Sequence, residues 1–241
     1  MIRITIWNEF RHEKTEPVKS VYPNGMHCAI AAGIAAEDLT IHCVALDAPE
    51  QGLPDELLKN TDVLIWWGHW AHREVADELV TRIRQRVLAG MGLIVLHSGH
   101  DSKVFKSLLG SSCSLRWRQV GERERIWTVA PDHPIARGVP QTFALEHEEM
   151  YGEPFDIPDD GKVIFMSWFQ GGDVFRSGVA FRRGNGRIFY FAPGHETFPT
   201  YYDSNVLTVI GNAVRWAAPS EFREKICVRW EPAEPLSGGN K

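Results

Sequence analysis

Short apolar runs alternate with helical segments through the first 110 residues of the chain. Runs rich in β-branched and aromatic residues predict strands at 2–7, 40–46, 62–67 and 92–96. Apolar residues at helical spacing predict helices over 26–39, 72–89 and 102–109. Because strands separated by helices pair in parallel, the pattern predicts a doubly wound α/β sheet with helices on both faces.

The alternation of strands and helices ends in the second half of the chain. Two β-type segments at 115–119 and 125–130 predict a solvated hairpin. Three further strands and a closing helix are predicted over 162–168, 178–181, 187–191 and 205–217. The sequence therefore predicts one domain over 1–218, with a mostly parallel sheet and an added antiparallel hairpin region. A C-terminal tail is predicted over 219–241.

Composition narrows the classes of function. The net charge is −5 at pH 7, so bulk electrostatics does not favour nucleic acid as a partner. No apolar stretch reaches the length of a membrane span, and no signal-peptide pattern follows Met1. The 4 cysteines show no CxxC spacing, so buried free thiols are expected rather than disulfides or zinc knuckles. We expect a cytoplasmic homo-oligomer that binds a small molecule.

Four histidines lie at or just after the carboxyl ends of three predicted strands. The segments are DVLIWWGHW with His69, GLIVLHSGH with His97 and His100, and GRIFYFAPGHE with His195. In open α/β sheets, ligands bind outside the carboxyl ends of the strands, where the strand order reverses. The sequence therefore predicts one composite histidine site at that edge. His27, in the first turn of the first predicted helix, is expected to lie near the same crevice.

The segment VLHSG, residues 95–99, has the form of a strand that turns sharply into a helix. Enzymes with this type of fold often place a nucleophile at such a turn, because the strained backbone exposes one side chain above the sheet. Here the exposed position belongs to His97. Ser98 does not fit the GxSxG pattern, because Leu96 and His100 replace the two glycines. Two interpretations stay open: His97 takes part in chemistry, or it only caps the turn by hydrogen bonding.

Seven motifs in order resemble those of the trehalose-utilisation (ThuA-like) family: NEFRHEK, YPNGMH, WWGHWAH, LHSGHDSKVFKSLLG, HPIARGV, EEMYGEPF and PGHETFPTYY. The resemblance runs from residue 1 to about 218. It implies a flavodoxin-like fold similar to class I glutamine amidotransferases. In that superfamily the turn carries a cysteine nucleophile, and His97 stands in its place. His195, which Glu196 follows, resembles the amidotransferase histidine. The resemblance also implies a role in the use of trehalose and related disaccharides, with 3-keto-sugars as candidate intermediates.

These residues support two chemical hypotheses. The first is a divalent metal, with zinc the usual choice for nitrogen-rich ligands, held by His27, His69 and His195. In this version His97 or Glu149 serves as the acid or base. The second is metal-free chemistry, in which His97, His195 and Glu149 remove a proton beside a ketone and protonate a leaving oxygen. Both describe a lyase or hydrolase that acts on a keto-glycoside.

Side chains that bind a sugar are expected beside these groups. The candidates are Trp67, His100, Glu148, Tyr151 and Tyr201. Aromatic side chains would serve a non-catalytic sugar-binding or regulatory protein equally well, so that alternative stays open. A hydrolase with a cysteine nucleophile is disfavoured, because no cysteine is predicted at a strand-to-helix turn.

Overall fold

The computed structural model describes residues 1–222 and 231–234. Within these residues, nine strands form one sheet with the order β2-β1-β3-β4-β9-β8-β7-β5-β6. The first five strands in this order are parallel, and all five lie where the sequence predicts strands. Their bounds are β2 (Leu39–Ala45), β1 (Ile2–Asn8), β3 (Val63–Trp67), β4 (Gly92–Leu96) and β9 (Gly186–Phe191). This half of the sheet has the doubly wound, flavodoxin-like arrangement.

The remaining strands pair antiparallel. They are β8 (Val174–Arg183), β7 (Lys162–Phe169), β5 (Arg116–Thr128) and β6 (Thr142–Gly152). The expectation of a mostly parallel sheet is therefore only partly met. The predicted hairpin over 115–119 and 125–130 is wrong, since β5 is one strand between β6 and β7. Gly121, with a φ of 70°, and register shifts around Glu122 interrupt the pairing without reversing the chain.

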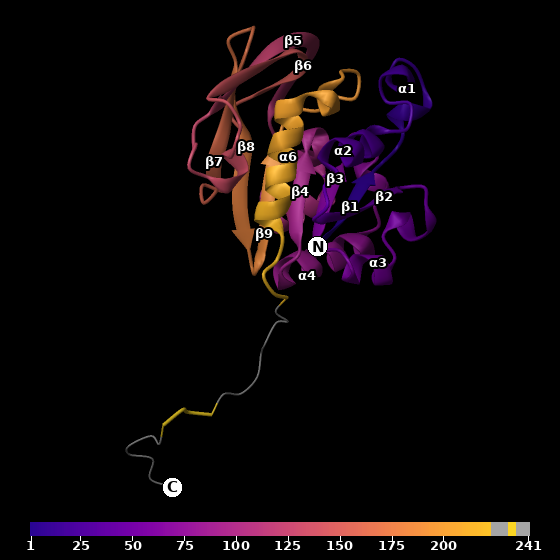
Figure 1. The fold of residues 1–241 in the computed structure, drawn as a ribbon, viewed down its shortest axis with the longest axis vertical. Helices are drawn as coiled ribbons and strands as arrows, with labels where there is room; N and C mark the ends of the chain where they lie inside the picture. The colour runs from indigo at the N-terminus through magenta and orange to yellow at the C-terminus, as the bar shows by residue number, and fades with distance from the viewer. Residues whose placement is uncertain (223–230, 235–241) are drawn as a thin grey trace.

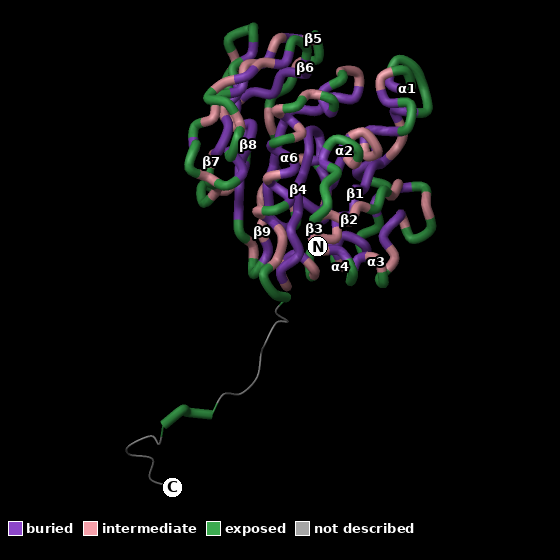
Figure 2. Tube along the Cα trace, viewed as in Figure 1, coloured by how far each residue is buried: buried purple, intermediate pink, exposed green. Residues whose placement is uncertain are grey.

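Helices cover both faces of the parallel strands (Figure 1). On one face, α2 (Met26–Ile34) and α6 (Ser204–Ala217) pack against Ile94 and Phe189 in a single apolar cluster. The other face carries a second cluster with α3 (Asp55–Lys59), α4 (Asp77–Ala89) and α5 (Lys103–Leu109). The central strands are buried along their whole length (Figure 2) because each of them supplies side chains to both clusters.

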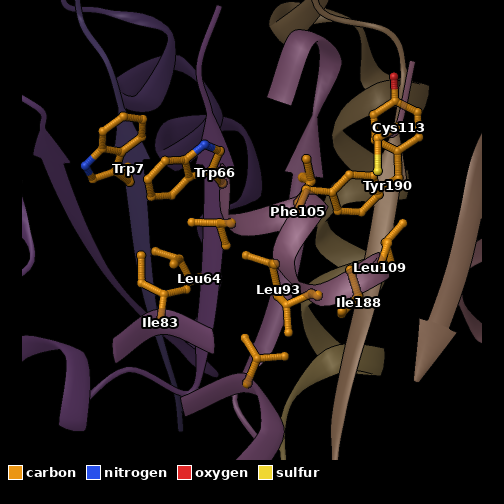
Figure 3. Packing of buried hydrophobic residues seen from close by; sticks show 14 of the residues in the cluster. Trp7, Leu64, Trp66, Ile83, Leu93, Phe105, Leu109, Cys113, Ile188 and Tyr190 are labelled. Carbon is orange, nitrogen blue, oxygen red and sulfur yellow. The ribbon is translucent and has the colours of Figure 1, made fainter. Parts of the chain in front are cut away.

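Aromatic rings pack among aliphatic side chains in the second cluster (Figure 3). Trp7 of β1 stacks on Trp66 of β3 with ring centroids 3.8 Å apart. Phe105 of α5 lies 5.6 Å from the ring of Tyr190 on β9. This packing fixes β1, β3 and β9 relative to one another, and each of these strands leads into the site described below.

Two helices differ from their predicted bounds. α2 ends at Ile34 rather than at residue 39, because Ala35 already has an extended ψ of 130°. The predicted helix over 72–89 is divided into a single turn, η3 (His72–Glu74), and α4. Ala76 separates them with a ψ of 138°, so the regular helix begins at Asp77.

The predicted tail over 219–241 lies mostly outside the described residues, which include only 219–222 and 231–234 of it. The short helix α1 (Val18–Val21) precedes α2, and α6 is the last helix of the described part. In that part of the chain, no helix combines the length and the apolar character needed to cross a membrane.

The sheet coils strongly between β4 and β6, which are separated by four strands. Adjacent strands rotate by about 20–25°, so five steps accumulate to roughly 100–125°. Register shifts in β5 and β7 bend the strands further. As a result, the end of β6 lies beside the carboxyl end of β4, where Glu149 contacts His97.

Candidate active site

Loops that follow β1, β3, β4 and β9 meet at the carboxyl edge of the parallel strands. The rings of His69, His97 and His195 lie together there. Their centroids are 5.9 Å apart for His69 and His97, 5.9 Å for His69 and His195, and 5.5 Å for His97 and His195. The ring of His12, in the turn η1 (His12–Lys14), lies 5.1 Å from that of His69. The structure thus brings three strand-end histidines and one loop histidine into one cluster.

His97 follows β4 with a left-handed backbone, at a φ of 48°. Such a conformation is uncommon for a residue other than glycine and is often found at functional sites. Its Nδ1 donates to the carbonyl of Ala192 at 2.9 Å, and its Nε2 lies 3.1 Å from Oε2 of Glu149. Both side chains are buried, so the contact is shielded from water.

His97 and Glu149 form an ion pair. Burial lowers the pKa of His97, but the hydrogen bond and negative charge of Glu149 outweigh burial and raise it above its usual value. Burial raises the pKa of Glu149, and the hydrogen bond to His97 more than reverses this effect, so that the pKa is lowered. The contact therefore favours an imidazolium that faces a carboxylate, and burial shields both groups from solvent.

His195 follows β9 and is buried. Its Nδ1 accepts a hydrogen bond from the backbone N–H of Thr197 at 3.3 Å and lies 2.8 Å from the hydroxyl oxygen of that residue. An accepting Nδ1 leaves the proton of the neutral ring on Nε2, which has no hydrogen-bond partner among the described residues. Burial, followed by the positive charge of His97, lowers the pKa of His195 to about 4. His195 is therefore a neutral imidazole with an unsatisfied Nε2–H.

The loop that carries His195 is held from two sides. Glu148 accepts hydrogen bonds from the backbone N–H of His195 at 3.2 Å and from the hydroxyl of Thr200. Gly194 has a φ of 136°, and a Cβ at this position would lie 2.0 Å from the hydroxyl oxygen of Tyr201. Only glycine fits at this position, so the backbone that places His195 requires Gly194.

Glu196 connects two groups of potential metal ligands. Its carboxylate oxygens lie 3.6 Å from Nε2 of His12 and 3.3 Å from Nδ1 of His69. Donor atoms of His12, His69 and Glu196 lie within 4.8 Å of one another, and so do those of His97, His195 and Glu196. Burial raises the pKa of Glu196, but the neighbouring histidines, His69 first, lower it to about 2. The sequence places His12 in a loop and Glu196 after His195, yet no local spacing links these residues.

His27 is not part of either group. Its Nδ1 lies 3.0 Å from the side-chain nitrogen of Asn8, and its ring stands edge-on to Phe10 with centroids 5.4 Å apart. The expected ligand set of His27, His69 and His195 is therefore not a cluster in this structure. The imidazole of His27 instead contacts Asn8, the last residue of β1, and Phe10 just after it.

Two of the residues expected to bind sugar lie beneath the histidines. Trp67 is buried, and its Nε1 donates to the carbonyl of Gly194 at 3.1 Å. Tyr201 is also fully buried. Both side chains support the loop after β9, and they are as buried as His97 and His195. The exposed ring at the site belongs instead to Trp70, which is 73% exposed and lies 4.0 Å from the ring of His12.

Tyr151 and His100 lie on the β4 side of the cluster. Tyr151 stacks on His97 with ring centroids 4.9 Å apart, and its hydroxyl is hydrogen-bonded to that of Ser98 at 2.7 Å. His100 stands edge-on to Tyr151 and donates from Nδ1 to the carbonyl of Cys113 at 2.8 Å. Tyr151 therefore separates His100 from the ring of His97.

Behind the site, Glu124 of β5 is a buried carboxyl group that the sequence analysis missed. It accepts a hydrogen bond from the hydroxyl of Ser167. Burial, and then the charge of Glu148, raise the pKa of Glu124 to about 8, and burial also raises the pKa of Glu148. The two groups share a buried region in which a proton is retained near neutral pH.

The cysteines of the described residues do not belong to the histidine cluster. Cys113 is buried beside Ser111, Cys43 is exposed on β2, and Cys28 lies on α2 with intermediate exposure. Cys227 falls outside the described residues. The turn after β4 begins at His97 and contains no cysteine.

A family model described as trehalose utilisation, ThuA, matches residues 3–217. No curated protein matches the chain. Among solved structures, a ThuA-like protein from Parabacteroides merdae ATCC 43184 superimposes with a TM-score of 0.67 at 13% identity, covering 93% of this chain and 92% of its own.

Two other solved structures share the fold. A protein from Salmonella typhimurium LT2, named a cytoplasmic protein, gives a TM-score of 0.64 at 11% identity and covers 90% of this chain and 100% of its own. A glutamine amidotransferase from Thermotoga maritima gives a TM-score of 0.54 at 12% identity, with coverage of 89% and 97%. The amidotransferase-like fold is thus shared, while the residue at the turn after β4 is a histidine in this chain.

Proposed function

Because this chain belongs to the ThuA family of trehalose utilisation, we propose that it acts on a trehalose-related sugar that carries a ketone. The reaction is the removal of a proton from the carbon beside the ketone, followed by loss of the glycosidic oxygen. The observation that carries this proposal is the buried ion pair of His97 and Glu149 beside the neutral ring of His195.

Each of these three side chains has a role in such a β-elimination. The carboxylate of Glu149 takes the proton from carbon, and the ketone oxygen accepts the developing negative charge. The Nε2–H of neutral His195 donates to that oxygen, which satisfies a buried donor that has no partner among the described residues. The imidazolium of His97 gives its Nε2 proton to the departing oxygen.

The pair then returns to its starting state. After the elimination, Glu149 carries a proton and His97 is neutral. Their facing atoms are 3.1 Å apart, so the proton passes from the carboxyl group to the imidazole, and the ion pair is restored. The proposed reaction uses no thiol, and both protons that move in it are accounted for.

The experiment uses 3-keto-trehalose in deuterated water, followed by NMR. Wild-type protein is expected to exchange the proton beside the ketone and then release a monosaccharide. Glu149→Gln is expected to slow both steps by about 10²–10⁴-fold, because general base catalysis typically contributes that much. His42→Gln, an exposed change on β2, serves as the control. Equal exchange by Glu149→Gln and wild-type protein contradicts the proposed role of Glu149.

A sugar-binding protein without activity is the second candidate, supported by the exposed ring of Trp70 beside His12. The two candidates differ in a simple comparison. A ligand that raises the melting temperature without being exchanged or cleaved indicates binding alone. We also propose a cytoplasmic location, supported by the name of the Salmonella protein that shares the fold, and a homo-oligomeric state that light scattering tests.

A further inference from the structure

Several buried polar atoms around Glu196 have no hydrogen-bond partner among the described residues. They are Nε2 of His12, Nε2 of His195 and Oε2 of Glu196. Unpaired buried polar atoms are costly and uncommon, and their concentration at one place indicates a site arranged for a bound group. The Nε2–H of His195 is a donor, which suits an oxygen atom. The atoms of His12 and Glu196 are different, since a carboxylate oxygen can only accept.

We propose that His12, His69 and Glu196 form a binding site for a divalent transition-metal ion, with zinc as the first choice. Nε2 of His12 and Nδ1 of His69 lie 3.6 and 3.3 Å from the two carboxylate oxygens of Glu196. Ligand atoms that bind one tetrahedral zinc ion at about 2.1 Å are about 3.4 Å from one another. Each histidine nitrogen is therefore near this spacing from one oxygen of Glu196, and one donor atom from each of the three side chains lies within 4.8 Å of the others.

Glu9 orients the two histidines from behind. Its carboxylate accepts hydrogen bonds from the backbone N–H groups of His69, Trp70 and Ala71, at 2.7, 3.0 and 3.0 Å. One of its oxygens also lies 3.4 Å from Nδ1 of His12. A proton on Nδ1 of His12 faces this carboxylate, so the lone pair is on Nε2, toward Glu196. A carboxylate behind a ligating imidazole is the usual support of a metal-binding histidine.

The second group around Glu196 is less suited to a metal. Both ring nitrogens of His97 are engaged, by the carbonyl of Ala192 and by Glu149. Nδ1 of His195 accepts from the backbone N–H of Thr197, which leaves a proton rather than a lone pair on Nε2. Of the two candidate ligand sets, these contacts favour the one that contains His12.

Two imidazoles and one carboxylate make a donor set that suits zinc and other transition metals better than Mg²⁺ or Ca²⁺, which prefer oxygen ligands. Three protein ligands leave at least one coordination position open. Glu196 belongs to both groups of side chains, so a metal at this site lies beside His97 and His195. The metal site goes beyond the proposed elimination and does not depend on it, because binding is measured without any sugar.

The experiment measures zinc binding to the full chain after treatment with a chelator, by calorimetry and by elemental analysis. One ion per chain is expected. His12→Gln and Glu196→Gln are each expected to weaken binding at least 100-fold. Glu9→Gln is expected to weaken it about 10–100-fold, the usual effect of losing a supporting carboxylate. His27→Gln and His195→Gln are expected to leave the affinity within about twofold of wild type.

Three results overturn the proposal. They are the absence of stoichiometric zinc binding, unchanged affinity in both His12→Gln and Glu196→Gln, and loss of binding in His27→Gln or His195→Gln. Because His12 and Glu196 are buried, thermal unfolding of each variant without metal checks that it folds. The absorption spectrum of the Co²⁺-loaded wild-type protein gives an independent readout: intense visible bands of a four- or five-coordinate ion support the site, and the spectrum of hexaaqua Co²⁺ contradicts it.

Discussion

At the scale of single residues, the site depends on side chains whose charges are set by burial and by one close partner each. His97 is paired with Glu149, whereas His195 has only neutral partners at Nδ1. Two imidazoles whose ring centroids are 5.5 Å apart therefore differ in charge. This difference supports the proposed roles of His97 as an acid and of His195 as a neutral hydrogen-bond donor.

Glu124 provides a stability prediction. Its pKa in the folded protein is about 8, above its ordinary value, because burial and Glu148 disfavour the charged form. A raised folded-state pKa means that its contribution to stability is full below about pH 4.5 and is lost as the pH rises to about 8. Relative to wild type, Glu124→Gln is therefore expected to gain at least about 1 kcal/mol of unfolding free energy between pH 5 and 8.

Urea unfolding of both proteins at pH 5, 6.5 and 8 measures this difference. Glu146→Gln, an exposed change on β6, is the matched control and should follow the pH dependence of wild type. A Glu124→Gln curve parallel to that of wild type would show that Glu124 is ionised in the folded protein.

The closeness of His69, His97, His195 and Glu149 was predictable, because each lies beside a recognisable strand or motif. The pairing of His12 with Glu196 was not, since these residues are far apart in the chain and meet only through β1 and β9. The contact of His27 with Asn8 was not predictable either. Which way a ring points depends on side-chain packing, and residue spacing does not record it.

At the scale of elements, the parallel strands were predictable because they are apolar on both faces. β6 was not predicted, and β5 was predicted as a hairpin, for a different reason. Both strands carry buried carboxylates, including Glu124, Glu148 and Glu149, at positions where a strand normally has apolar side chains. The carboxylates at and near the site thus interrupt the apolar pattern by which strands are recognised in a sequence.

The start of α6 gives a prediction at this scale. Asp203 caps the helix by accepting hydrogen bonds from the backbone N–H groups of Asn205 and Val206, at 2.8 and 3.1 Å. Asp203→Ala is expected to reduce the unfolding free energy by about 1 kcal/mol, and Asp203→Asn by much less, because asparagine also caps helices well. Chemical denaturation measures both variants. An unchanged unfolding free energy in Asp203→Ala would show that the cap contributes nothing.

At the scale of the whole molecule, the chain shares its fold with a glutamine amidotransferase but has a histidine at the turn after β4. Its described cysteines lie outside the histidine cluster. Under native conditions, alkylation with iodoacetamide is therefore expected to leave most of the proposed activity on a keto-sugar, since none of the described cysteines lies at the site. Complete inactivation by the reagent, with protection by the sugar, would contradict this expectation.

The coiling of the sheet has a consequence for the precision of the site. His97 and Glu149 belong to strands that four other strands separate, yet their facing atoms are only 3.1 Å apart. The accumulated twist of the four intervening strands thus sets the position of Glu149 relative to His97. A small change in the twist between any two neighbouring strands displaces β6, and the displacement grows with the distance of that strand pair from β6. Substitutions in the core of β7 or β8 are therefore expected to change the distance between His97 and Glu149 without altering either residue.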